Sequence, residues 1–528
     1  MRWASATACL FLLLAAMPAR ADAVYRIRSD RWTAADERGY GEFLAALGDS
    51  ACRSVDACLK SPANPFRASD PAVRFWADCA DLPYFLRFYY AWKRGLPFSY
   101  AAQVSPRGRA RDIRYSASGN RVASRRDVLS GADALSVMNR LRDGVSSATY
   151  RIDPELEAPL AQDFYSPALA PGGIRPGTVI YDPNGHLAVV YRVERNGRIH
   201  YIDAHPDNSL TRGTYDVRFV RSSPGMGAGF KNWRPLHLEG GRREGGVIVG
   251  GRMVPADNRA IPDFALTQYY GTGARQAGSW RNGQFLLGAK RVDYYDYVRA
   301  MLSGGSLHFD PVREIGDMVA SNCADLHYRA EAVDIALAAG LQNRAQPERL
   351  PPNIYGADGD WETYSTPSRD ARLKTAFKAL RDTAERFLNL WRAKDPSLNY
   401  QGAHLADDML AAYDRQASAC RLSWRRSDGV AMSLGYEEAR RRLFRLSFDP
   451  HHCAERRWGA EGAELAACRD GAVKRAWYEA QQSLRNQIDR TYDARMDFSL
   501  RELESGAGGV AAAPDTDTRA FLLRAPRP

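Results

Sequence analysis

The chain has 528 residues, of which 45% are hydrophobic, and its formal net charge is +11. This length allows two or three domains, each with its own hydrophobic core. No segment reaches the ~20 consecutive apolar residues that a membrane-spanning helix needs. Basic residues are spread along the chain without the basic and aromatic pattern of nucleic-acid-binding proteins. The composition therefore argues against a membrane-spanning protein and against a nucleic-acid-binding protein.

The first 23 residues have the pattern of a secretory signal peptide. Arg2 precedes a short apolar run at residues 8–17, and small residues around Ala21 and Ala23 offer cleavage sites. We therefore expect residues 1–23 to be removed and the mature protein to be exported. The periplasm is the expected destination, with secretion into the medium as the alternative.

The cysteines that follow this leader are odd in number. Seven of the eight cysteines remain after it, and an odd count in an oxidising compartment predicts one free thiol. Proximity in the sequence and the shared helical half suggest the pairs Cys52–Cys58, Cys453–Cys468 and Cys323–Cys420. The sequence alone permits other connectivities, but this one leaves Cys79 free.

A buried helix is predicted directly after Cys79. Residues 84–94 are mostly apolar with basic residues in the last turn, and Gly95 provides a stop signal. Pro83 suits the first turn, where its missing N–H is not needed. Cys79 then lies at or just before the helix N-terminus. The positive end of the helix dipole would lower the pKa of the thiol and favour the reactive thiolate.

A turn that runs into a strand, at residues 174–181, and a following hairpin are predicted next. Residues 186–193 form an apolar run that begins with a histidine, and Asn196-Gly197 is a strong signal for a two-residue turn. Residues 198–205 would return antiparallel to this run. The pattern predicts a small antiparallel sheet.

The register of this hairpin decides which polar group lies near His186. Strict pairing across a two-residue turn places Asp203 opposite Val190, on the same face as His186. A strand twist or a bulge would be needed to bring Asp203 to His186. His205 or Asp207 could instead be the nearer group.

Three short segments resemble motifs of known cysteine peptidases. Residues 78–82 (Asp-Cys-Ala-Asp-Leu) resemble the Asp-Cys-Ser-Gly-Leu motif around the nucleophile of NlpC-like peptidases. Residues 176–181 resemble their Pro-Gly-Asp strand, with Thr178 in place of the aspartate. Residues 185–190 are similar to the Gly-His-Val-Ala-Val-Val segment of CHAP-like peptidases. With cysteine, histidine and a polar residue in this order, the first half resembles the papain-like superfamily and its cell-wall amidase branches.

The resemblance implies a role for each polar residue. Cys79 would be the nucleophile, His186 the base and Asp203 the orienting group, with His205 as the alternative. It also implies peptidoglycan stem peptides as substrates and no cofactor. Two departures are the long interval between Cys79 and His186 and the acidic Asp81, where the motif has a small residue.

The segment around Cys79 has a partial repeat in the second half. Residues 323–326 read Cys-Ala-Asp-Leu, as do residues 79–82, and His404 follows later. A second active site there is conceivable. However, no strand pattern follows His404, and Cys420 offers a disulfide partner. We therefore favour a structural role for Cys323.

Together these patterns predict an α+β protein in two parts. We expect a papain-like domain over residues 24–240, a mainly helical domain over residues 241–505 and a disordered tail over residues 506–528. The function we expect is that of an exported cysteine amidase or peptidase acting on a cell-wall peptide or another amide. The alternatives are a transglutaminase-like acyl transferase and a non-catalytic envelope protein that binds a partner or serves as a scaffold. No cofactor, metal or nucleic acid is expected.

Overall fold

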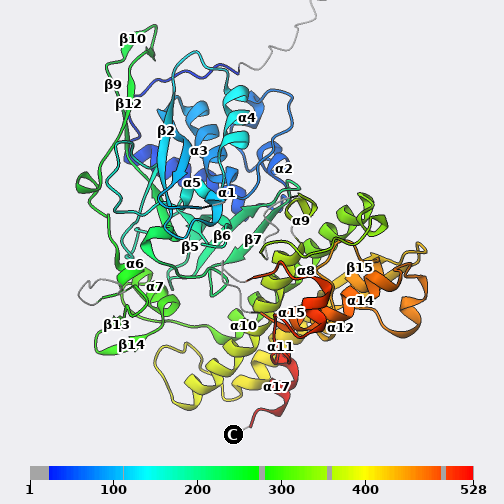
Figure 1. Ribbon diagram of the computed structural model, residues 1–528. Coiled ribbons are helices and arrows are strands. Elements are labelled where there is room, and N and C mark those ends of the chain that lie inside the picture. The colour runs from blue at the N-terminus through cyan, green and yellow to red at the C-terminus, as the bar shows by residue number, and fades with distance from the viewer. Residues whose placement is uncertain are drawn as a thin grey trace, which may run out of the picture.

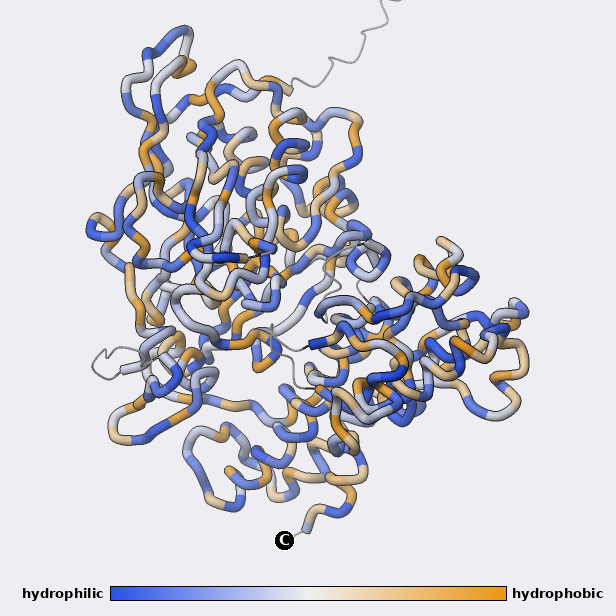
Figure 2. Tube along the Cα trace, in the orientation of Figure 1, coloured by the Kyte–Doolittle hydropathy of each residue, from blue (hydrophilic) through white to orange (hydrophobic). Residues whose placement is uncertain are grey.

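The protein mixes helices with small antiparallel sheets. The computed structural model describes residues 23–110, 112–272, 280–353, 359–364, 366–488 and 495–526. The predicted signal peptide, apart from Ala23, lies outside these residues. None of the helices within them is long and apolar enough to cross a membrane. Figure 2 agrees, since hydrophobic and hydrophilic segments alternate along the coloured part of the chain.

A six-stranded antiparallel sheet forms the centre of the first part of the chain, at the upper left of Figure 1. Its strands, in spatial order, are β3 (Phe164–Tyr165), β8 (Gly229–Trp233), β4 (Val179–Tyr181), β5 (Leu187–Val193), β6 (Ile199–Ala204) and β7 (Leu210–Thr214). A separate two-stranded ribbon joins β1 (Phe98–Pro106) to β2 (Asn120–Val128). The strand predicted to follow a turn within residues 174–181 is therefore present as β4, and the hairpin predicted at residues 186–205 is present with slightly shorter strands.

Both faces of the central sheet are covered, which explains why β5 is apolar and buried from Leu187 to Tyr191. Leu187 and Val189 join a core with the helices α1 (Ala34–Asp49) and α3 (Asp81–Arg94). Ala188 and Val190 join a second core with α7 (Tyr294–Leu302) on the opposite face. Successive strand residues point to opposite faces, so a strand buried on both sides needs apolar residues at every position.

Helix α3 begins slightly earlier than predicted and ends where predicted. The Asp78 carboxylate accepts hydrogen bonds from the backbone N–H groups of Ala80 (2.8 Å) and Asp81 (3.0 Å). It thereby caps N–H groups that have no partner within the helix. The helix ends at Gly95, which adopts the left-handed conformation (φ 70°) that glycine tolerates best. These ends place Cys79 just before the first turn.

The second part of the chain is mainly helical and lies at the lower right of Figure 1. Its core is formed by α8 (Pro311–Ala338), α10 (Thr366–Arg392) and α11 (Leu405–Ala419), with the β15 (Arg421–Arg425) and β16 (Ala431–Gly435) hairpin. Smaller elements are α9 (Gly359–Tyr364), α12 (Tyr436–Arg442), α13 (Ala454–Arg457), α14 (Ala472–Ala480), α15 (Gln482–Asn486), α16 (Leu500–Glu504) and α17 (Thr518–Arg524).

Two stretches differ from the expected domain limits. Residues 241–302 pack with the first part of the chain, because Ile248 and Met253 join the core of α3 while Val298 packs on the sheet. The expected tail also includes α17, whose Leu522 is fully buried in the helical core. The apolar residues of α17 give this segment a face that packs on the core. The high content of Gly, Ala and Pro in the segment as a whole predicted disorder and did not indicate this helix.

Ion pairs join the two parts across their contact. Among them are Arg198–Asp317 (2.7 Å), Glu194–Arg313 (2.7 Å), Asp296–Arg386 (2.5 Å) and Arg218–Asp325 (3.2 Å). The Arg198 and Arg218 side chains are almost fully buried. Buried charges of this kind are stable only when they are paired. The pairing fixes how the helical part sits on the sheet.

Candidate functional site

A cavity of about 210 Å³ lies where α3, the central sheet and the helical part meet. Its wall includes the four residues that the sequence nominated: Cys79, His186, Asp203 and His205. From the helical part, α8 and α10 contribute Asp325, Tyr328, Arg369, Arg372 and Leu373. The cavity is thus built by both parts of the chain.

Cys79 is the free cysteine of the chain segments that the structure describes. The other six form the pairs Cys52–Cys58, Cys323–Cys420 and Cys453–Cys468, which confirms the expected connectivity. The pairing of Cys323 removes it as an alternative nucleophile, because a disulfide sulfur has no thiolate to offer. Cys79 is only partly buried.

His186 and Asp203 form a direct contact in this cavity. The His186 Nε2 atom lies 2.7 Å from the Asp203 carboxylate. Asp203 is 2% exposed and also accepts a hydrogen bond from the Thr211 hydroxyl of β7. With Nε2 bonded to the carboxylate, Nδ1 is the ring nitrogen that can exchange a proton with a thiol.

The hairpin register that produces this contact differs from strict two-residue pairing. Glu194 and Arg198 are hydrogen-bonded across the turn, so the loop has three residues. A bulge between Val190 and Arg192 shifts the register once more, and Val190 faces Tyr201 instead of Asp203. Each of these two changes shifts the register by one residue. Together they leave Asp203 on the same face of the sheet and bring it two positions closer to His186 along β5.

His205 and Asp207 make other contacts. The His205 Nε2 atom lies 3.0 Å from Thr211 Oγ1 and 3.8 Å from the Asp203 carboxylate, and its ring lies 4.0 Å from the Tyr328 ring. Burial lowers the pKa of His205 to about 3, so this ring is neutral at physiological pH. Asp207 bonds to Ser209 and faces Arg369 at 3.4 Å. Among the three candidates, Asp203 is the group bonded to His186.

The Cys79 thiol is less acidic than its position suggested. Burial raises its pKa well above the ordinary value, and Asp78 and Asp203 add to the effect, while the backbone N–H of Leu187 opposes it. The expected lowering by the helix dipole is therefore wrong. The N–H groups that would favour a thiolate are bonded to the Asp78 carboxylate. The thiol is neutral at physiological pH.

Asp203, by contrast, is held as a carboxylate. Burial opposes its ionisation, but His205, the hydrogen bond from His186 and the nearby Arg372 together lower the pKa of Asp203. An ionised Asp203 can fix the orientation of the His186 ring and stabilise an imidazolium if one forms.

Several cavity residues were not identified from the sequence. Asn184 and Ser147 line the cavity next to His186, and the Asn184 side chain is 3% exposed. Asn184 belongs to the turn Asp182-Pro183-Asn184-Gly185, which reads as an ordinary turn. Arg369 and Arg372 lie on α10, far along the sequence from Cys79. Only the tertiary structure brings these residues to the site.

Comparisons with models of protein families, with curated proteins and with solved structures found no match to this chain. The assignment of function therefore depends on the geometry of this cavity.

Proposed function

We propose that the protein is an exported cysteine amidase or peptidase with a papain-like arrangement of Cys79, His186 and Asp203. The observation that carries the proposal is the 2.7 Å contact between His186 and a buried Asp203 in the cavity that also contains the unpaired Cys79. A nucleophile, a base and a group that orients the base are what thiol acyl transfer requires.

In the proposed reaction, His186 Nδ1 accepts the thiol proton as Sγ attacks the carbonyl carbon of the amide. The tetrahedral intermediate collapses when the C–N bond breaks and the imidazolium returns the proton to the leaving amine. Water, deprotonated by His186, then attacks the thioester carbonyl; the C–S bond breaks, the acid is released and the imidazolium returns the proton to the Cys79 thiolate. In this reaction the backbone N–H of Cys79 would stabilise the oxyanion, and the amide of Asn184, which also lines the cavity, would be the second donor.

The raised pKa of Cys79 shapes this mechanism. A thiol that is neutral at physiological pH must lose its proton during the attack, because no preformed thiolate is present. His186 then acts as a general base in the step that forms the C–S bond. Substrate that fills the cavity and displaces water would strengthen the effect of the His186–Asp203 pair.

Peptidoglycan stem peptides are the substrates we favour, and the periplasm is the favoured location. Three disulfides fit an oxidising compartment. The basic net charge of +11 favours approach to anionic polymers of the cell wall.

A non-catalytic role is the second candidate, and the raised pKa of Cys79 is the observation that favours it. A partly buried, neutral thiol beside two carboxylates is also typical of an inert cysteine. In this case the cavity would bind a partner or a peptide without cleaving it.

Digestion of purified sacculi separates these functions. The wild-type protein should release peptides with new amino groups, which labelling and mass spectrometry can count, and both Cys79→Ala and His186→Ala should release none. Equal behaviour of wild type and Cys79→Ala would support the non-catalytic role. An added amine acceptor identifies an acyl transferase, because the product would then carry the amine in place of a new carboxylate.

A further inference from the structure

Helix α10 carries two arginines into the wall of the cavity. Arg369 and Arg372 are three residues apart, which places them on one face of the helix. They lie in the same cavity as Cys79, His186 and Asp203. A helix from the second part of the chain thus brings two positive charges to a site that the first part builds.

Arg369 is buried with unused hydrogen-bonding capacity. Its side chain is 9% exposed, and its guanidinium lies 4.3 Å above the Tyr328 ring. One terminal nitrogen faces Asp207 at 3.4 Å, which is long for a charged hydrogen bond. Among the residues that the structure describes, the buried Nε atom has no hydrogen-bond partner. A buried guanidinium edge without a partner is unfavourable and points to a ligand.

Arg372 has even fewer contacts. Within the ranges that the structure describes, its guanidinium has no hydrogen-bond or ion-pair partner. Its neighbours are the Phe219 ring, 5.7 Å away, and the charge of Asp203. Asp203 is bonded to His186 and Thr211, so the donors of Arg372 are available to a substrate.

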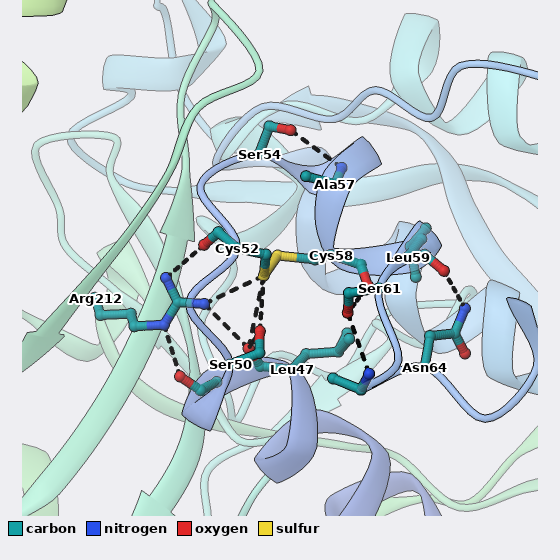
Figure 3. Close-up of a disulfide and its surroundings, with 12 residues drawn as sticks. Leu47, Ser50, Cys52, Ser54, Ala57, Cys58, Leu59, Ser61, Asn64 and Arg212 are labelled. Atoms are coloured by element: carbon teal, nitrogen blue, oxygen red, sulfur yellow. Dashed lines mark hydrogen bonds between the residues drawn. A yellow bond between two sulfur atoms is a disulfide. The ribbon is translucent and has the colours of Figure 1, made fainter.

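The other arginines of the cavity, and Asp325, already have partners. Arg212 donates to the carbonyl oxygens of Leu47, Gly48 and Cys52, beside the Cys52–Cys58 disulfide shown in Figure 3. Arg114 pairs with Asp112 and Glu362, and Asp325 pairs with Arg218 at 3.2 Å. Arg369 and Arg372 are therefore the cavity's positive groups with donors to spare.

We propose that Arg369 and Arg372 form a subsite for a carboxylate of the substrate, next to the bond that Cys79 attacks. The substrate class is then a peptide with a free carboxylate close to the cleaved amide, and the helical part supplies the specificity. Guanidinium groups suit this task because their planar donors match a carboxylate in two parallel hydrogen bonds. This inference rests on the proposed amidase function for its place in the reaction.

The test compares two forms of one peptide. The probes are the tripeptide L-alanyl-γ-D-glutamyl-meso-diaminopimelate with all its carboxylates free, and the same tripeptide with all of them amidated. Binding is measured by calorimetry to the full-length mature Cys79→Ala protein, and cleavage is measured with the wild type. We expect the free-acid form to bind at least about tenfold more tightly, as two charge-assisted pairs would give.

Variants on α10 connect this preference to the two arginines. In the Cys79→Ala background, Arg369→Gln and Arg372→Gln should each reduce the preference for the free-acid peptide over the amidated peptide about tenfold or more. Arg369→Lys should keep part of this preference. Arg392→Gln is the matched control, because Arg392 is exposed at the far end of the same helix. Circular dichroism checks that each variant is folded. Arg372→Gln also removes a positive charge near Asp203 and can therefore affect the His186–Asp203 pair. Arg369→Gln is the more specific test of carboxylate binding.

The outcomes separate this inference from the proposed function. No binding of the free-acid form, or a preference that Arg369→Gln and Arg372→Gln leave unchanged, overturns the subsite. If the wild type cleaves both forms equally well, the amidase stands and the subsite fails. If the arginines control binding but neither form is cleaved, the subsite stands and cleavage of this peptide fails.

Discussion

At the scale of single residues, the site depends on which polar group orients His186. Asp203 is bonded to His186 at 2.7 Å and is ionised, whereas His205 is neutral and bonded to Thr211 at 3.0 Å. Burial and neighbouring charge thus give two nearby side chains different states. Their substitutions should have different consequences.

Asp203→Asn should reduce kcat about a hundredfold or more, because the neutral amide cannot stabilise the imidazolium as a carboxylate does, and its NH2 group can donate to Nε2 and favour the wrong tautomer. His205→Gln is the matched control and should reduce kcat by less than about tenfold, because His205 has no direct bond to His186. Steady-state kinetics of amino-group release provide the measurement. A larger loss for His205→Gln would show that the orienting group has been misassigned.

The pKa of Cys79 is testable by alkylation. The rate of iodoacetamide labelling should rise only at strongly alkaline pH, because burial, Asp78 and Asp203 raise the pKa of the thiol. Asp78→Asn should move the inflection to lower pH, since it removes a negative charge and asparagine still caps the helix. Mass spectrometry of the labelled peptide gives the rate at each pH. An inflection below neutral pH would instead indicate a preformed thiolate.

At the scale of elements, the first turn of α3 combines capping with a buried acid. Burial, with help from Asp78, raises the pKa of Asp81 to about 9, and its side chain is 1% exposed. Asp81 is therefore protonated in the folded protein at neutral pH and ionised in the unfolded chain. The folded state binds more protons between about pH 4 and pH 9, so its stability falls as the pH rises through this range.

Asp81→Asn should remove this part of the pH dependence. The variant mimics the protonated acid, so at pH 8 it should be more stable than the wild type by at least about 1 kcal/mol. At pH 4 the two should be similar. Urea unfolding at both pH values gives the comparison. The idea fails if the two proteins lose stability in parallel as the pH rises.

The elements also show what the sequence could reveal. Apolar runs and a glycine stop predicted α3 and the β5–β6 hairpin, because burial and backbone geometry act locally there. The contact between His186 and Asp203 needed a three-residue loop and a bulge, which the Asn-Gly signal does not disclose. Arg369 and Arg372 were not identified as individual site residues, because an arginine on an amphipathic helix has the pattern of a solvated residue in the sequence.

At the scale of the whole molecule, two parts of the chain meet around one cavity. The disulfides in these parts close loops of very different length, so we expect them to stabilise the fold to different extents. Cys323–Cys420 joins residues 97 positions apart and ties α8, which lines the cavity, to the end of α11. Cys52–Cys58 spans only 6 positions. Cross-links that close longer loops remove more entropy from the unfolded chain.

Replacing both members of Cys323–Cys420 by serine should lower the free energy of unfolding of the helical part by about 2–5 kcal/mol. The same change at Cys52–Cys58 should have a smaller effect. Thermal unfolding followed by circular dichroism measures both variants. A larger loss for the short loop would mean that local packing, and not chain entropy, dominates the contribution of these bonds.

The central claim is that Cys79 is the nucleophile of an amide hydrolase, and it can be tested by titrating the thiol against activity. Non-reduced mature protein is labelled with iodoacetamide to increasing extents, and amino-group release from sacculi is measured at each extent. We expect the label on Cys79 alone and activity that falls in proportion to zero at full labelling. A protein that is fully labelled at Cys79 and still releases amino groups at the original rate would contradict the claim.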